Sequence, residues 1–132
     1  MIGDDGEIIA VLDWEICTLG DPLADIGLLL VYSPDQGVAS TTGLPSPTAL
    51  EGFPSQAEML ARYAEISGRD LSGIDYYVAF GYWKLACIIE GVYARYVGGA
   101  MGDRGDASSF DYFGQQVIAV AEQARQAMAR IG

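Results

Sequence analysis

Two short stretches, IIAVLDWE at residues 8–15 and GDPLAD at residues 20–25, decide how this chain is interpreted. The first is a run of β-branched and aliphatic residues that ends in a carboxylate, Asp13, and Glu15 follows two residues later. A buried strand with this ending is expected where the strand meets a polar cleft, because burying a carboxylate without a partner is unfavourable. The two stretches therefore predict a strand over residues 7–14 and a helix after it, with acidic side chains between them.

A turn signal, Asp4-Asp5-Gly6, lies just before the predicted strand. A tight turn in this position implies an antiparallel partner strand on its N-terminal side. Met1 and Ile2 are the residues placed to form that partner. The expected β structure is a short N-terminal β-hairpin remnant.

The rest of the chain predicts helices, so the expected fold class is mostly α (α+β). Asp21 is suited to cap a helix from Leu23 to about Tyr32, with Pro22 at the first position, where a missing amide donor has no consequence. This helix is apolar nearly all round and is expected to be buried. Capping signals and apolar periodicity predict three more helices. The first begins at Ser55, where Glu58 completes a capping box, and runs to near Gly68 with an apolar face of Met59, Leu60, Tyr63 and Ile66. The second runs from Asp75 to Val97, and the third runs from Ser108 or Asp111 to about Ile131, with Arg125 and Arg130 near its negative end.

The organisation expected from these elements is a single partial domain over residues 1–132. Four of the five prolines fall between residues 33 and 54, with Gly, Ser and Thr, which predicts a long surface loop within that domain. Loops of this length are either functional lids or simply mobile segments, and both interpretations stay open.

Charge and residue usage exclude several classes of function. The formal net charge is −11, so the chain is expected to bind neither nucleic acid nor an anionic membrane surface. With no histidine and only Cys17 and Cys87, a zinc site lacks ligands, and two reduced core thiols in a cytoplasmic protein are expected. The apolar span from Tyr76 to Val97 is interrupted by Lys84, Glu90 and Arg95, which predicts a core helix of a soluble protein.

The candidate chemistry rests on Asp13. Magnesium in phosphoryl transfer is held by one or two carboxylates together with phosphate oxygens and water, and a strand-end carboxylate can supply one of these ligands. If the extended conformation continues, Glu15 lies on the same side and could assist the metal or contact a substrate. The alternative is structural: Asp13 caps a turn and Glu15 is solvated.

The segment Leu12-Asp13-Trp14-Glu15, followed by residues 20–27 (GDPLADIG), resembles the metal-binding end of the aminoglycoside phosphotransferase-like family, whose fold is related to that of protein kinases. The resemblance implies that Asp13 coordinates Mg²⁺, as the DFG aspartate does in protein kinases. It implies that Asp25, a first-turn acid that also suits the helix dipole, braces the catalytic loop, with Asp21 as further structural support.

The later sequence resembles the long C-lobe helix of the branch associated with acyl-CoA dehydrogenases, on the residues Tyr77, Phe80, Lys84, Leu85, Ala86, Arg95-Tyr96 and Gly98-Gly99. The aromatic side chains of Tyr82, Trp83 and Tyr93 are expected to pack in the core. Lys84 and Arg95 are either surface charges or partners for an acid such as Asp25 or for a substrate anion.

The resemblance implies transfer of the ATP γ-phosphate to the hydroxyl of a small-molecule substrate, with Mg²⁺ and ATP as cofactors. The family's His-Gly-Asp catalytic loop, its magnesium-binding Asn and its nucleotide lobe do not precede Asp13, so no catalytic residue is assigned in this chain. We therefore expect a C-terminal lobe fragment that is inactive by itself.

Two alternatives to this function stay open: a helical interaction module that forms a homodimer, and a remnant without a ligand. The acidic composition suits a cationic aminoglycoside substrate. The dehydrogenase-associated branch suggests a hydroxyacyl-CoA instead.

Overall fold

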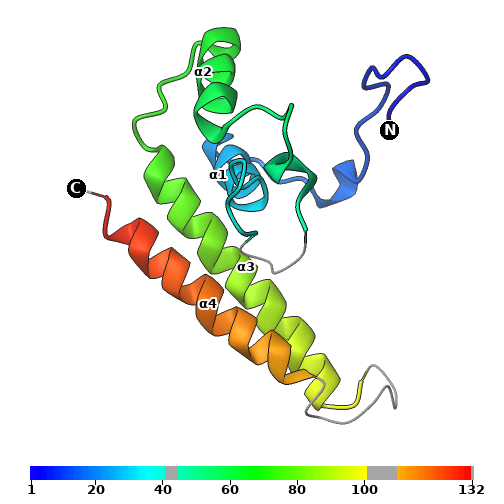
Figure 1. Cartoon of the computed structure of the whole chain (residues 1–132), viewed down its shortest axis with the longest axis vertical. Coiled ribbons are helices and arrows are strands. Elements are labelled where there is room, and N and C mark those ends of the chain that lie inside the picture. Colours follow the sequence, from blue (N-terminus) through cyan, green and yellow to red (C-terminus); the bar gives the residue numbers. More distant parts are fainter. Residues whose placement is uncertain (41–44, 101–109, 132) are drawn as a thin grey trace.

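The computed structural model describes residues 1–40, 45–100 and 110–131, and helices form most of this part of the chain (Figure 1). The expectation of a mostly α fold is confirmed. The α-helices of the described residues are α1 (Leu23–Tyr32), α2 (Gln56–Ser67), α3 (Ile74–Val97) and α4 (Asp111–Met128), and two 3-10 turns are η1 (Trp14–Ile16) and η2 (Pro47–Ala49).

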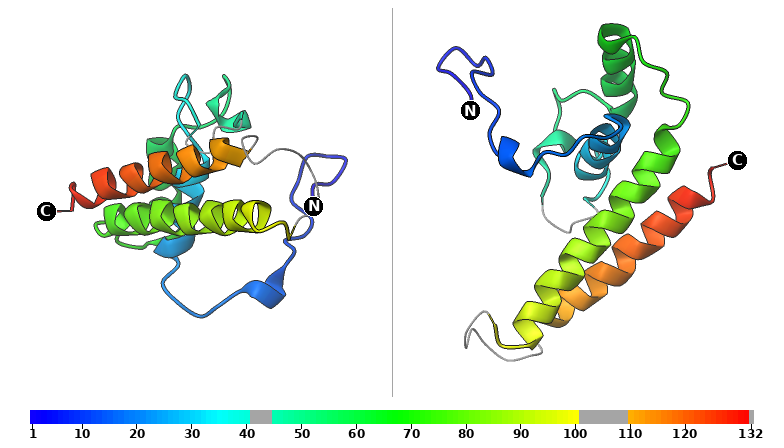
Figure 2. Two further views of the ribbon diagram at one scale, coloured as in Figure 1. Left: turned by 90° about the horizontal axis from the view of Figure 1, so that it is seen from below. Right: turned by 180° about the vertical axis from the view of Figure 1, so that it is seen from behind.

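A long antiparallel hairpin of α3 and α4 forms the body of the molecule, and α1 packs against α3 (Figures 1 and 2). The buried cluster joins all three helices through Val31 of α1, Leu85 and Ala86 of α3 and Val120 of α4. Partly buried apolar residues pack around this cluster: Val78, Tyr82 and Ile89. The expectation that Tyr82 packs in the core is therefore confirmed.

Glycines allow α1 and α3 to approach closely. A Cβ added to Gly27 would lie 2.5 Å from both the carbonyl carbon and the carbonyl oxygen of Tyr77. A Cβ added to Gly81 would lie 3.2 Å from a methyl carbon of Val31 and 3.3 Å from the carbonyl oxygen of Gly27. Real Cβ atoms do not fit at the first of these distances, so the crossing requires glycine at position 27.

Helix α2 begins as its sequence predicts. Ser55 accepts a hydrogen bond from the amide of Glu58, and the Glu58 carboxylate accepts from the amide of Ser55, which completes the capping box. The side-chain amide of Gln56 donates to the carbonyls of Leu30 and Ser33, at 2.9 Å each. These bonds tie α2 to the end of α1. Helix α2 has no fully buried residue among those described, and its apolar face borders an open cavity of about 420 Å³.

The predicted strand from Glu7 to Trp14 is wrong. Its β structure is reduced to one antiparallel bridge between Ile2 and Ile8, and Trp14 begins η1 instead of ending a strand. The turn and the partner residues do form, since the amide of Gly3 donates to the carbonyl of Glu7. A two-stranded hairpin alone is marginal, and the described residues contain no third strand that could extend it into a sheet.

The segment from Met1 to Gly20, here called the N-terminal arm, extends away from the helices (Figures 1 and 2). Its apolar side chains are exposed rather than buried. The exposed fractions lie between 61% and 71% for Ile8, Ile9, Val11, Leu12 and Trp14. The expectation of a buried strand fails because no other described segment packs over these side chains.

Other predictions of burial are corrected in the same way. Helix α1 is not buried all round, since Leu29 is 47% and Tyr32 is 44% exposed. Trp83 is 57% exposed, although a core position was expected. Cys17 and Cys87 are free thiols, as expected, but both are exposed. Leu29, Tyr32 and Trp83 each line an open cavity between helices that the neighbouring side chains do not fill.

The helix boundaries follow the predictions with small shifts. Helix α3 begins at Ile74, one residue before Asp75, and ends at Val97 as predicted. Helix α4 begins at Asp111 but ends at Met128, so Arg130 lies beyond the helix; Ser108 falls outside the described residues. Residues 33–40 and 45–54 contain η2 as their regular element. No helix within the described residues is both long and apolar enough to cross a membrane.

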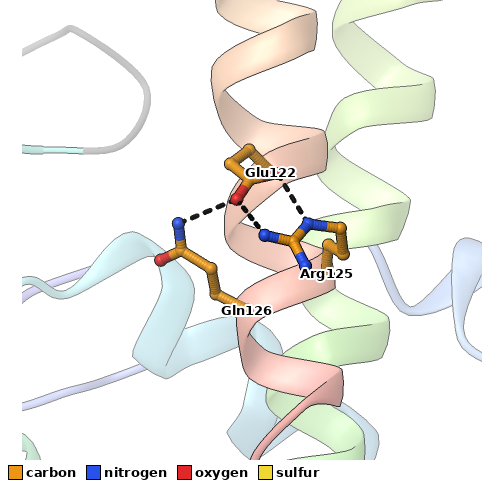
Figure 3. A network of polar contacts seen from close by, with 3 residues as sticks. All are labelled: Glu122, Arg125 and Gln126. Atoms are coloured by element: carbon orange, nitrogen blue, oxygen red, sulfur yellow. Dashed lines mark hydrogen bonds and ion pairs between the residues drawn. The ribbon is translucent and has the colours of Figure 1, made fainter.

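A polar network of three side chains lies on α4 (Figure 3). Arg125 donates two hydrogen bonds to the Glu122 carboxylate, at 2.8 and 2.7 Å, and Gln126 donates a third. Donation by Arg125, and then by Gln126, lowers the pKa of Glu122 to about 2. The spacing of three and four residues makes this a local support of the helix, so we assign it no part in a site.

Candidate functional site

The turn that carries Asp13 has a distinctive backbone. Asp13 adopts a left-handed conformation with φ 63°, as no other non-glycine residue does in the described part of the chain. Aspartate tolerates this region better than β-branched residues do. The indole Nε1 of Trp14 donates to the carbonyl of Val11 at 2.8 Å, and the amide of Cys17 donates to the carbonyl of Trp14 at 3.1 Å. The first bond closes a turn around Asp13, and the second closes η1 directly after it.

The side chain of Asp13 is exposed. Among the described residues it has no hydrogen-bond or ion-pair partner, and it does not cap η1. The structural alternative, in which Asp13 acts as a turn cap through its side chain, therefore lacks a contact to support it. The carboxylate is available to a ligand from solvent.

Glu15 does not lie beside Asp13 in the way the sequence suggested. That expectation required an extended chain, but Asp13 is left-handed and Glu15 is the middle residue of η1. Because a 3-10 turn rotates successive side chains by about 120°, the period-two argument no longer applies. Glu15 is exposed, and its part in a site stays a prediction.

Asp21 is the best-anchored acid of the region. One carboxylate oxygen accepts from the amide of Leu23 at 2.9 Å, and the other accepts from the hydroxyl of Tyr77 at 2.9 Å. Asp21 therefore caps the start of α1, as predicted, and also joins this helix to the first turn of α3. The role of structural support expected for Asp21 gains a specific partner in Tyr77.

Asp25 lies in the first turn of α1, where the sequence placed it, and is exposed. Its carboxylate has no partner among the described residues, and neither Lys84 nor Arg95 forms an ion pair with it there. Both basic residues are exposed on α3. Among the described residues, Asp21 thus has defined hydrogen-bond partners, whereas the carboxylates of Asp13 and Asp25 have none.

The acids of this region do not form a metal site made of protein ligands alone among the described residues. The described residues contain no cluster of three or more histidine, cysteine, aspartate or glutamate side chains that could hold an ion. A calcium or zinc site, which requires many or dedicated protein ligands, is therefore not supported in this part of the chain. Magnesium bound through one carboxylate together with phosphate oxygens and water fits the free carboxylate of Asp13.

Sequence reasoning did not assign a role to Tyr77. The residue belongs to the stretch that resembles the long C-lobe helix, but its contact with Asp21 spans 56 positions in the chain. No local pattern reports such a contact. The sequence signal that was available is the position of Tyr77 in the first turn of its helix, which packs against the helix that Asp21 caps.

Comparison with known protein families identifies the class to which this chain belongs. Residues 1–76 match the model of the Phosphotransferase enzyme family, which includes the arm, α1 and α2. The chain belongs to this family. The resemblance inferred from Asp13, Asp21 and Asp25 is thereby confirmed at the level of the family.

Curated relatives carry the likeness through most of the chain. The human acyl-CoA dehydrogenase family member 11 is 31% identical over 125 residues, which is 93% of this chain and 16% of the human protein. The mouse acyl-CoA dehydrogenase family member 10 is 34% identical over 67% of this chain and 9% of its own length. A probable acyl-CoA dehydrogenase of Arabidopsis thaliana is 33% identical over 70% of this chain.

The chain thus spans about one sixth of the length of the human relative and less than a tenth of the length of the mouse relative. The expected likeness to the dehydrogenase-associated branch is confirmed. No solved structure matches the chain significantly.

The contact between Asp21 and Tyr77 perturbs both groups. The amide of Leu23 first, then the hydroxyl of Tyr77 and the charge of Arg69, hold the pKa of Asp21 below its usual 3.8. The carboxylate acceptor raises the pKa of Tyr77 above its usual 10.0, because it stabilises the protonated phenol; desolvation and the neighbouring Tyr76 act in the same direction.

We expect the stabilisation by this pair to depend on pH in two windows. A depressed folded pKa means that the contribution of Asp21 is complete above its unfolded value and is lost as pH falls through the folded value. The raised pKa of Tyr77 means that its contribution is complete below its unfolded value and is lost as pH rises through the folded one. The difference in urea midpoint between wild type and Tyr77→Phe should be largest between about pH 5 and pH 9. A difference that stays constant from acid to alkali would contradict this coupling.

Proposed function

We propose that this chain is the metal-binding part of a cytoplasmic phosphotransferase that transfers the γ-phosphate of ATP, with Mg²⁺, to a hydroxyl group of a small molecule. The observation that carries the proposal is the free carboxylate of Asp13, held on an exposed turn inside the stretch that matches the family. An acid that binds an ion from solvent has to be reachable, and Asp13 is exposed with no internal partner among the described residues.

Asp13 would hold the Mg²⁺, and when bound this ion neutralises charge on the phosphates of ATP. The residues of the chain have separate tasks in this proposal. Asp13 binds from the turn closed by Trp14, Asp21 fixes the start of α1 through Leu23 and Tyr77, and Asp25 faces solvent where it could brace a further segment. Glu15 stays a candidate for contact with the metal's water shell or with the substrate.

The test of metal binding uses Trp14 as a reporter and Mn²⁺ as the probe. In a Trp83→Phe background Trp14 is the remaining tryptophan, so quenching of its fluorescence by Mn²⁺ reports an ion bound beside it. We expect Asp13→Ala to weaken the Mn²⁺ affinity, measured with ATP present, by roughly tenfold or more, because the site has a single protein carboxylate.

The matched control for this measurement is Asp4→Ala. It removes one exposed acid from the same arm and has no expected effect on the affinity beyond a small change in charge. Equal, saturable quenching in wild type and Asp13→Ala would overturn the proposal.

The 132-residue polypeptide by itself is proposed to transfer little or no phosphate. Positioning of the nucleotide and stabilisation of charge account for most of phosphoryl transfer, and one carboxylate on an exposed arm supplies little of either. An assay of ADP formation with ATP, Mg²⁺ and a panel of aminoglycosides and hydroxyacyl-CoA compounds should give the background rate. Robust turnover by this polypeptide would contradict this part of the proposal.

A second candidate function, self-association as an interaction module, is favoured by the exposed apolar side chains of the arm. In this proposal two arms pair as antiparallel strands, which would cover Val11 and Leu12 in both copies. Sedimentation velocity should then give a dimer for wild type and a monomer for Val11→Lys. A wild-type monomer at high concentration would exclude this candidate.

A further inference from the structure

The arm that carries Asp13 is attached to the helices at one end. In the described part of the chain, the hydrogen bonds made by the first twenty residues stay within residues 1–17. For example, the Met1 ammonium donates to the carbonyl of Ala10, and the amide of Cys17 donates to the carbonyl of Trp14. Thr18, Leu19 and Gly20 are exposed, and Leu19 is fully so. Asp21 is therefore the first residue after the arm whose side chain is bonded to the helices.

At that junction, Asp21 is held by two elements at once. The amide of Leu23 fixes one carboxylate oxygen in α1, and the hydroxyl of Tyr77 fixes the other from α3. Pro22 follows with φ −59°, the value its ring imposes, so the backbone cannot rotate freely on the helical side of Asp21. The hydroxyl of Tyr77, from another helix, holds the side chain of Asp21 as well, so Asp21 itself has little freedom to turn.

The position of Tyr77 is determined by the packing of the helices. Its backbone lies directly against Gly27, where α1 and α3 cross closely. Its ring also contacts the ring of Tyr76 edge to face, with 5.2 Å between the centroids. The crossing therefore delivers the Tyr77 hydroxyl to Asp21 at a fixed place, and the hydroxyl is 2.9 Å from the carboxylate without any contact to the arm itself.

We infer that Tyr77 is a positioning residue for Asp13: its hydroxyl holds Asp21, the residue at which the arm joins the helices, and so restricts the directions in which the arm presents the carboxylate of Asp13. This inference rests on the proposed role of Asp13 in metal binding. Tyr77 touches neither metal nor nucleotide in this assignment. It acts on the orientation of the arm, which can be measured without any ligand.

The experiment is time-resolved fluorescence anisotropy of Trp14 in the Trp83→Phe background. In the parent, Trp14 should follow the tumbling of the whole molecule, with a small fast component from the arm. Tyr77→Phe removes one hydroxyl and keeps the ring, and we expect the amplitude of the fast component to rise by about twofold. The midpoint of thermal unfolding should change by only a few degrees, because the bond is exposed and the crossing at Gly27 is retained.

Two controls isolate the bond. Tyr76→Phe removes the hydroxyl of the adjacent tyrosine and should leave the anisotropy of Trp14 unchanged. In an Asp21→Ala background the arm is already released, so Tyr77→Phe should add nothing to the fast component. A general loosening of the helices would instead add to the effect of Asp21→Ala.

The outcomes separate this inference from the proposed function. An unchanged fast component in folded Tyr77→Phe overturns the positioning role, whatever Mn²⁺ does. An additive effect of the two substitutions overturns it as well. If wild type and Asp13→Ala bind Mn²⁺ with equal affinity, the proposed function is overturned instead. The effect of Tyr77 on the orientation of the arm would still stand.

Discussion

Gly27→Ala should destabilise the fold by about 2–4 kcal/mol, which is among the largest effects expected from a single methyl group. The added Cβ would lie 2.5 Å from the backbone carbonyl carbon and oxygen of Tyr77, and 2.8 Å from the Tyr77 Cβ. These atoms are fixed in a helix and cannot turn aside as the end of a long side chain can. Alanine gains about 1 kcal/mol in helix propensity over glycine, which is too small to offset the clash.

The matched control is Gly91→Ala on α3. A Cβ added there meets no atom within 4 Å, so only the helix propensity changes, and stability should rise by up to about 1 kcal/mol. Gly81→Ala should fall between the two, since its contacts of 3.2 and 3.3 Å require the neighbours to move slightly. Urea unfolding followed by far-UV circular dichroism measures all three. Equal effects at positions 27 and 91 would show that the crossing is not as close as the structure has it.

The sequence predicted those elements whose signals are local. The capping box of Ser55 and Glu58, the cap at Asp21 and the ends of α3 are all encoded within a few residues, and the structure has them within one or two positions. The close crossing at Gly27 was not predicted, because a glycine in a helix carries no mark of which helix will pack against it.

The strand was predicted wrongly for the same physical reason. The pattern over residues 8–12 is that of a strand to be covered on both faces, but a strand forms only when other segments pair with it and pack over it. The described residues offer one bridge, from Ile2 to Ile8. The exposure of Trp83 has a similar origin: periodicity finds an apolar face, and the neighbouring elements decide whether that face is covered.

For the candidate site, the sequence supplied the acids and the structure supplied their differences. In the sequence, Asp13, Asp21 and Asp25 are three aspartates of one motif, and nothing local shows that their environments differ. In the structure Asp21 has two partners, whereas Asp13 has a left-handed backbone and a free carboxylate. The partner that distinguishes Asp21, Tyr77, lies 56 positions away and becomes visible only when α1 crosses α3.

Leu85→Ala should destabilise the protein by about 2–5 kcal/mol, the range for truncating a buried leucine. Leu85 is 3% exposed and belongs to the buried cluster with Val31 of α1 and Val120 of α4. Its side chain therefore supports both interfaces of α3 at once. It also lines a cavity of about 360 Å³ beside Tyr32 and Phe113, so removing it enlarges a space that the neighbours already leave unfilled.

The comparison that makes this prediction specific is Ile88→Ala, three residues further along α3. Ile88 is 47% exposed and lies outside the buried cluster, so its truncation should change the free energy of unfolding by about 1 kcal/mol or less. Because domains of this size are stable by only about 5–15 kcal/mol, Leu85→Ala should shift the urea midpoint strongly, and Ile88→Ala only slightly. If the two substitutions had similar effects, then the α1, α3 and α4 interfaces would not meet at Leu85.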